Sequence, residues 1–205
     1  MEHAGSGHRR SIAEIEAGLP DVRRSPRDIG TLELIVRRPA VDAREVLTHA
    51  DLGPRTGLVG DTWIGRSSSG APGRLPDSDR QLTVINSRFA ELIAGPDPKA
   101  WALAGDQLYV DLHLSVDGLP AGSLMAIGDR AVIQVTDQPH AGCAKFAARF
   151  GRDAHAMVCT EDGRRLRLRG LNARVVTAGT IRPGDLVRVQ PPMPDSAPRD
   201  ILTSG

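Results

Sequence analysis

The residues best suited to chemistry gather at Thr136 to Gly151, which reads T-D-Q-P-H-A-G-C-A-K-F-A-A-R-F-G. The alternating apolar run before it, Ala131 to Val135, predicts a strand, and the Pro-His-Ala-Gly corner predicts a turn into a short helix that begins with Cys143. Unpaired backbone N–H groups and the helix dipole favour an anion at such a start, so they favour the nucleophilic thiolate form of cysteine. The pattern therefore predicts a reactive thiol.

A buried structural role for Cys143 is the alternative, because free cysteine is among the most buried residue types. At helical spacing Cys143, Phe146, Ala147 and Phe150 share one stripe, which is the face that a helix turns toward the core. A reactive thiol on this stripe has to lie at the inner edge of the helix and face an enclosed cleft. The residues alone leave both roles open.

Two neighbours of Cys143 carry charge or protons. Histidine is the usual side chain for proton transfer near neutral pH, so one role for His140 is to shuttle a proton to or from the sulfur. The alternative is that His140 fixes the corner by a bond to the backbone. Lys145 lies about 200° from Cys143 around the helix, so we expect a surface charge there. His140 is therefore the candidate catalytic partner of Cys143.

The elements that position these residues are mostly strands. Gly-Asp turns beside apolar alternation recur at Gly60-Asp61, Gly105-Asp106, Gly128-Asp129 and Gly184-Asp185, where glycine supplies positive φ and aspartate caps its own backbone. A second strand-to-helix corner follows at Asn86, which is placed to cap the helix S-R-F-A-E-L-I-A. Many short strands with few helices predict a mainly β fold, either a barrel or a strongly bent antiparallel sheet with a few short peripheral helices.

The length of 205 residues predicts one domain with extensions. We expect an N-terminal arm, partly flexible, at residues 1–30 with a short helix at Ser11 to Ala17, a folded domain at 31–191 and a tail at 192–205. The Ser/Gly/Pro stretch Arg66 to Asp79 predicts a loop. A homodimer is compatible with this organisation.

Charge and cysteine content exclude several partner classes. The formal net charge of +1 gives no broad attraction to nucleic acid or to a membrane surface, and no apolar run reaches the ~20 residues of a membrane helix. Two cysteines without a secretory leader favour a cytoplasmic location. Cys159 falls in A-M-V-C-T-E-D-G, at the end of an expected strand, where a structural role is favoured. A disulfide between Cys143 and Cys159 stays open.

The order of these pieces resembles the MOSC domain, named for the C-terminal domain of molybdenum-cofactor sulfurases. The resemblance spans roughly Thr31 to Val189 and rests on G-L-V-G-D-T-W, Q-L-T-V-I-N-S-R, L-A-G-D-Q-L-Y-V-D-L-H-L-S, P-H-A-G-C-A-K-F and L-R-G-L-N-A-R-V-V-T-A-G-T-I-R-P-G-D. It implies a β-barrel and a functional cysteine, which falls on Cys143. It also implies a bound molybdenum pterin cofactor (molybdopterin).

The resemblance implies two roles for Cys143: a sulfur carrier that holds a persulfide, or a ligand of the molybdenum. Relatives use the cofactor to reduce N-hydroxylated compounds, so the chain is either an oxidoreductase, a sulfurtransferase or a non-catalytic module that binds and delivers the cofactor. Electrons or sulfur would come from an unidentified donor protein. A chain of this length has no room for the pyridoxal-phosphate domain that the eukaryotic sulfurases carry, so bound pyridoxal phosphate is not expected.

Further cofactor-binding candidates follow from the same resemblance. Arg169, Asn172 and Arg174 in R-G-L-N-A-R supply the donors that a phosphate and a pterin ring require, although exposed arginines alternating on a strand have the same pattern. Asn86 and Asp61 are weaker candidates. The helix cap and the Gly-Asp turn are the favoured roles for these two.

Overall fold

The computed structural model describes residues 9–65, 76–190 and 192. Several expectations therefore concern residues outside the described ranges: the first eight residues of the N-terminal arm, positions 66–75 of the Ser/Gly/Pro loop, and the C-terminal tail apart from residue 192.

Seven strands of the described chain close into a barrel in the order β11-β7-β8-β9-β5-β6-β1, because β1 also pairs with β11. The barrel strands are β1 (Ile29–Arg37), β5 (Leu82–Asn86), β6 (Leu108–Asp111), β7 (Leu124–Ile127), β8 (Ala131–Val135), β9 (Leu171–Thr177) and β11 (Leu186–Gln190). A short strand, β2 (Glu45–Leu47), pairs with the end of β1. The remaining strands, β3 (Ala50–Gly53), β4 (Gly57–Leu58) and β10 (Gly179–Ile181), form a small separate sheet.

The predicted mainly β barrel is confirmed, with one difference in strand direction. Among the described barrel pairs, β5 and β6 run parallel and the others antiparallel. Parallel neighbours require a crossover connection. Here the chain crosses through α2 (Ser87–Ala94), α3 (Pro98–Trp101) and the 3-10 helix η3 (Ala102–Ala104) before it returns as β6.

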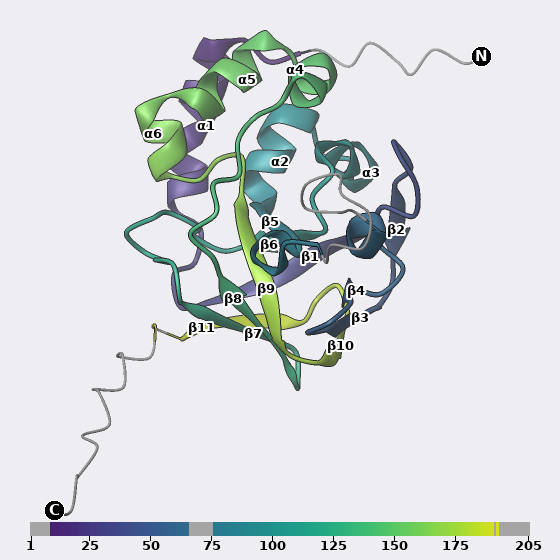
Figure 1. The fold of residues 1–205 in the computed structure, drawn as a ribbon. Helices are drawn as coiled ribbons and strands as arrows, with labels where there is room; N and C mark the ends of the chain where they lie inside the picture. Colours follow the sequence, from purple (N-terminus) through teal and green to yellow (C-terminus); the bar gives the residue numbers. More distant parts are fainter. Residues whose placement is uncertain (1–8, 66–75, 191, 193–205) are drawn as a thin grey trace, which may run out of the picture.

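Helices gather at one end of the barrel (Figure 1). Besides α2 and α3 these are α1 (Ile12–Arg23), α4 (Ala144–Phe150), α5 (Arg152–Cys159) and α6 (Glu161–Arg165); two further 3-10 turns are η1 (Thr62–Gly65) and η2 (Ser78–Arg80). In the described ranges, no helix has the length and apolar character needed to cross a membrane.

Two hydrophobic cores follow from the alternation of side chains along the strands. Val84, Leu108 and Val110 point into the barrel core, while Ile85 and Tyr109 belong to a second core beneath the helices. β5 and β6 are therefore buried on both faces. This arrangement holds the ends of these strands, and the turns that precede them, firmly against the helical layer.

Helix α1 is longer than the segment Ser11 to Ala17 that the sequence indicated. Ser11 and Glu14 form a reciprocal capping box at its start. Ile15, Leu19 and Val22 lie on one face and are buried in the second core. The continued apolar spacing after Ala17 explains the extra turns.

The segment before Cys159 is a helix, so the expected strand there is wrong. Ala154, Met157 and Val158 are spaced at three and four residues and are buried, which is the pattern of a helix face. The short apolar run A-M-V-C fits a strand or a helix when it is considered alone. Cys159 is thus the last residue of α5.

Candidate functional site

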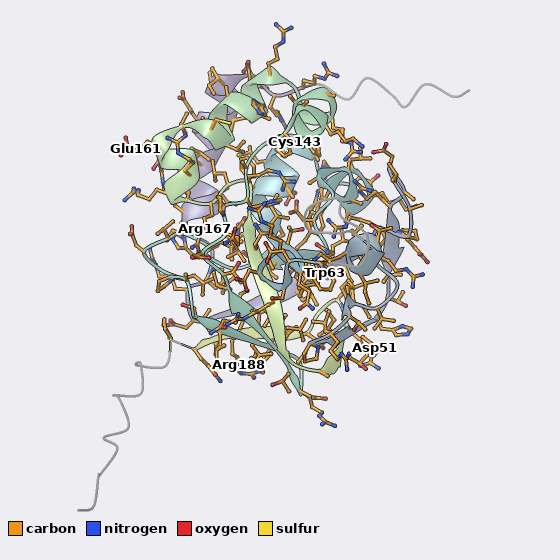
Figure 2. All side chains as sticks on the ribbon, viewed as in Figure 1. Asp51, Trp63, Cys143, Glu161, Arg167 and Arg188 are labelled. Atoms are coloured by element: carbon orange, nitrogen blue, oxygen red, sulfur yellow. The ribbon has the colours of Figure 1, made fainter. Side chains whose placement is uncertain are left out.

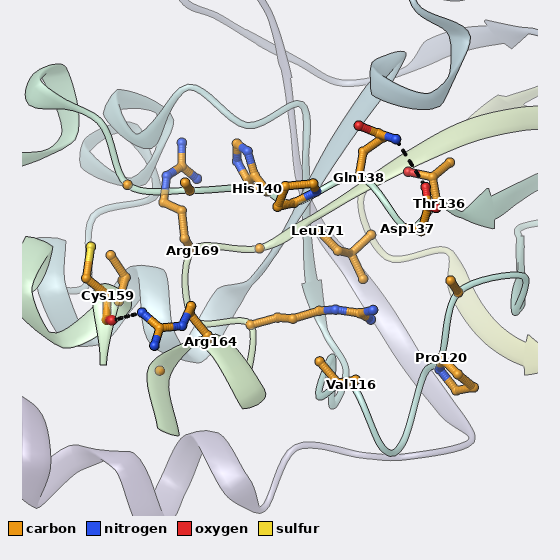
Figure 3. A pocket seen from close by; sticks show the side chains of 18 residues that line it. Val116, Pro120, Thr136, Asp137, Gln138, His140, Cys159, Arg164, Arg169 and Leu171 are labelled. Atoms are coloured by element: carbon orange, nitrogen blue, oxygen red, sulfur yellow. Dashed lines mark hydrogen bonds between the residues drawn. The ribbon is translucent and has the colours of Figure 1, made fainter. Parts of the chain in front are cut away.

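A cavity of about 510 Å³ opens where the barrel meets the helices (Figure 3). The loop 136–142 after β8 forms one wall, and the chain from α5 through α6 to the start of β9 forms another. The lining consists of Val116, Pro120, Ala121, residues 136–142, Val158, Cys159, Gly163, Arg164, Arg167, Arg169, Gly170 and Leu171. The cavity therefore adjoins the P-H-A-G-C segment and the R-G-L-N-A-R segment that the sequence singled out.

Asp106, two residues before β6, organises the inner wall of this cavity. Its carboxylate is fully buried and accepts a hydrogen bond from Nη1 of Arg169 at 2.6 Å. Nε2 of His140 lies 2.8 Å from the other carboxylate oxygen. Burial alone would raise the pKa of Asp106, but Arg169 and His140 outweigh it and hold the pKa at about 2. Asp106 is therefore ionised and fixes two residues that the sequence predicted separately.

Arg169 is the predicted cofactor-binding residue with the clearest place in the cavity. Besides its bond to Asp106, it donates from Nη2 to the carbonyl oxygen of Ala104 at 3.1 Å. Its guanidinium lies 5.0 Å from the ring centre of Phe146. Its Nε is buried and has no hydrogen-bond partner in the described part of the chain, which is unusual for a buried polar atom.

Two further arginines in the lining were not predicted. Within the described residues, Arg167 donates only to the carbonyl oxygens of Leu114 and Leu119, at 3.4 and 2.6 Å. Arg164 donates to the carbonyl oxygen of Cys159. Neither has a carboxylate partner among the described residues. Burial lowers the pKa of Arg167. The lining thus carries positive charge that the described chain leaves uncompensated.

Arg167 also has an unusual backbone conformation. Its φ of 49° lies in the left-handed region, which residues other than glycine rarely adopt. Such conformations cost free energy and cluster at functional sites. The signal in the sequence was the run R-R-L-R-L-R, whose positive charges are too many for the nearby carboxylates to balance.

Cys143 lies at the start of α4, as predicted, but its thiol does not face the cleft. α4 begins at Ala144, and Cys143 is the residue before it with an extended backbone (φ −120°, ψ 169°). The helical stripe of Phe146 and Phe150 therefore does not continue to Cys143, because the stripe applies only inside the helix. Cys143 is exposed, and the described cavity lining ends at its neighbour Gly142.

Cys159 lies in the cavity wall instead. Its sulfur lies 4.0 Å from Nε2 of His155, one turn earlier on α5. A Cβ added at Gly142 would lie 3.0 Å from His155 and from Val158, so the loop before Cys143 packs against this helix. Both cysteines are free and exposed. The cavity therefore has a thiol in its wall and a second thiol just outside its rim.

The other candidates in the R-G-L-N-A-R segment support the walls. Asn172 is buried and donates from Nδ2 to the carbonyl oxygens of Gln138 and Pro139, both at 3.2 Å, so it holds the loop 136–142 in place. Arg174 contacts Gln134 and lies 3.1 Å from Asp79. It lines a shallow neighbouring hollow rather than the main cavity.

The remaining predicted residues are engaged elsewhere. Asn86 caps α2 by accepting a bond from the N–H of Phe89, and its amide donates to Ser25 and Leu112. Asp61 is buried and pairs with Arg38. Burial favours a higher pKa for its carboxyl group, but the hydrogen bonds and charge of Arg38 outweigh burial, so the pKa of Asp61 is lowered.

Lys145 pairs with Asp42 at the surface, so it is the surface charge that its position on the helix indicated. No group of three or more potential metal ligands among His, Cys, Asp and Glu occurs in the described ranges.

Comparison with known proteins supports the sequence resemblance. A family model for the MOSC domain matches residues 78–188, which include Asp106, Cys143 and Arg169. No curated protein sequence matches the chain.

Three solved structures share the fold. The YuaD protein from Bacillus subtilis is 16% identical, with a TM-score of 0.54 over 78% of this chain and 95% of that one. A hypothetical protein is 20% identical, with a TM-score of 0.54 over 85% and 72% of the two chains. YiiM from Escherichia coli is 17% identical, with a TM-score of 0.51 over 80% and 72%. At these identities the likeness concerns the fold.

Proposed function

The chain belongs to the MOSC domain family, which is associated with molybdenum-cofactor binding, and from this premise we propose that it binds a molybdenum pterin cofactor in the main cavity and uses Cys143 as a reactive thiol. The bound cofactor would supply the redox and sulfur chemistry of molybdenum. The two free cysteines agree with a reducing, cytoplasmic location, which is part of the proposal.

The residues present fit such a cofactor. Arg164 and Arg167 offer guanidinium groups without a carboxylate partner in the described chain, and these suit a phosphate. Pro139 and Leu171 supply apolar wall for a flat ring. The observation that carries the proposal is Arg167, because a half-buried guanidinium that donates only to carbonyl oxygens among the described residues calls for an anion.

The position of Cys143 favours the sulfur-carrier role. An exposed thiol outside the cavity rim can meet a donor protein directly. Its thiolate would attack the outer sulfur of a donor persulfide, R–S–SH; a new S–S bond forms, the old one breaks, and R–S⁻ leaves. Cys143 then carries the outer sulfur as its own persulfide, and no net electrons are exchanged.

Reduction of N-hydroxylated compounds is the second candidate, and His140 is the observation that favours it. His140 lines the cavity and is held through Nε2 by Asp106. It could give a proton to the departing hydroxyl group. The reaction takes two electrons from an electron-transfer protein and two protons, and it yields an N–H group and water.

Cofactor content is the direct test. The protein would be expressed in cells that make the molybdenum cofactor, and molybdenum and fluorescent pterin would be measured after purification. We expect both in the wild type, an at least tenfold loss in R167A, and full content in R188A, whose side chain is exposed on β11 (Figure 2). Wild-type protein free of metal and pterin would overturn the proposal.

Protein that contains the cofactor then distinguishes the three alternative functions. A sulfur carrier shows sulfane sulfur on wild type but not on C143S after incubation with a persulfide donor. A reductase turns over hydroxylamine substrates and loses this activity in H140A. A delivery module does neither, yet transfers its cofactor to an acceptor apoenzyme.

A further inference from the structure

A second, smaller hollow of about 180 Å³ lies where the end of α1 meets the end of α6. Its rim carries Arg23, Arg27 and Arg165, and its floor carries His113 and Ser115. We infer that this hollow binds a tetrahedral oxyanion, either free phosphate or the phosphate group of a phosphomonoester. The inference is independent of the cofactor proposed for the main cavity.

The charges around the hollow leave a positive excess. Asp162 pairs with Arg23 and with Arg165, and Asp117 lies 3.7 Å from Arg165. Arg27 has no hydrogen bond or ion pair with any residue in the described ranges. Three guanidinium groups therefore face two carboxylates, and Asp117 is 73% exposed and only loosely paired. A bound anion would neutralise this excess positive charge.

Two polar side chains on the floor of the hollow are buried. His113 and Ser115 are 8% and 5% exposed. Ser115 accepts a bond at Oγ from the N–H of Gly118, so its own hydroxyl hydrogen is left to donate. Burial and then the nearby charge of Arg27 lower the pKa of His113, while a hydrogen bond to the backbone of Arg23 acts in the opposite direction.

The hollow and the main cavity use different residues. Val116 lines the main cavity, whereas its neighbours Ser115 and Asp117 line the hollow. In the same way Arg164 belongs to the cavity and Arg165 to the hollow. The two sets of lining residues have no member in common, so single substitutions can separate the two sites.

Inorganic phosphate is the first probe, with the imidazole signals of His113 followed by NMR and assigned with the H113Q variant. We expect a saturable shift in the wild type and an at least tenfold weaker affinity in R27A, with R27K in between. The matched control is R24A, because Arg24 is exposed and pairs with Asp21 outside the hollow; it should bind phosphate as the wild type does.

Further measurements distinguish free phosphate from a phosphomonoester, and the hollow from the main cavity. Tighter binding of glycerol 3-phosphate than of phosphate assigns a phosphomonoester, and the reverse assigns free phosphate. The shift should persist in R164A, because Arg164 lines the main cavity and donates to the carbonyl oxygen of Cys159. The inference is overturned by the absence of a saturable shift, by unchanged affinity in a folded R27A, or by a shift that R164A abolishes and R27A retains.

Discussion

Arg169 and Asp106 form a buried ion pair, with Nη1 2.6 Å from Oδ2, between residues 63 positions apart in the chain. Asp106 precedes β6 and Arg169 precedes β9, so the pair ties together two strands that are not adjacent in the barrel. The same carboxylate holds His140. The orientation of two cavity residues therefore depends on one buried charge.

Replacement of this charge should destabilise the fold. In D106N the guanidinium of Arg169 stays buried without a counter-charge, and breaking a buried pair in this way costs about 3–5 kcal/mol. We expect that loss in the free energy of unfolding measured with urea. D137N is the matched control, because Asp137 lies in the same cavity wall but is exposed; it should stay within about 0.5 kcal/mol of the wild type. A D106N protein as stable as D137N would contradict the role of the pair.

The same pair predicts a dependence of stability on pH. The pKa of Asp106 falls from the ordinary 3.8 to about 2 on folding, because Arg169 and His140 outweigh the burial of the carboxylate. Its stabilisation is therefore complete above pH ~4 and is lost as the pH falls toward 2, by roughly 2 kcal/mol. The difference in unfolding free energy between wild type and D106N should narrow by that amount between pH 5 and pH 2. A constant difference across this range would refute the assignment.

The sequence predicted the barrel because its signals are local. Each Gly-Asp turn and each apolar alternation is contained in a few residues, and Asn86 caps α2 as its position before the helix indicated. Asp106 was assigned only a turn because its partners, Arg169 and His140, are far away in the chain. Burial and charge pairing over such separations are properties of the fold and not of a short motif.

The two cysteines also show that a short sequence motif does not determine long-range packing. The spacing placed Cys143 on the buried stripe, but the stripe fails at the residue before the helix, where the backbone is extended. Cys159 was assigned to a strand because a four-residue apolar run does not distinguish the two periods. Which thiol faces the cavity was therefore decided by the packing of α5 against the loop 136–142.

Bound cofactor should protect Cys159 but not Cys143 from alkylation. In the free protein both thiols are exposed, so iodoacetamide should label both. A ligand in the cavity covers Cys159, and we expect its labelling to slow at least tenfold while that of Cys143 is unchanged. Mass spectrometry can follow the two separately, because trypsin places them in different peptides, 131–145 and 153–164. Protection of Cys143 would instead support its role as a molybdenum ligand.

Removal of the Asn86 side chain should affect stability and not cofactor content. N86A removes the cap of α2 and leaves the carbonyl oxygen of Leu112 without its donor, so we expect a loss of about 2–3 kcal/mol in urea unfolding. Folded N86A expressed in cofactor-producing cells should contain as much pterin as the wild type. Loss of pterin at unchanged stability would restore Asn86 as a cofactor-binding residue.

The close approach of Gly170 to β5 should make this position intolerant of any side chain. Its φ is 99°, and a Cβ here would lie 2.4 Å from the carbonyl oxygen of Val84, which belongs to a barrel strand and cannot move aside. We expect G170A to lose about 3 kcal/mol or more of unfolding free energy, from backbone strain and the clash together. Gly184 separates the two contributions, because its φ is 92° but no atom lies within 4 Å of the added Cβ. G184A should therefore lose only about 1–2 kcal/mol. Equal losses in the two variants would show that strain alone accounts for the glycine next to Arg169.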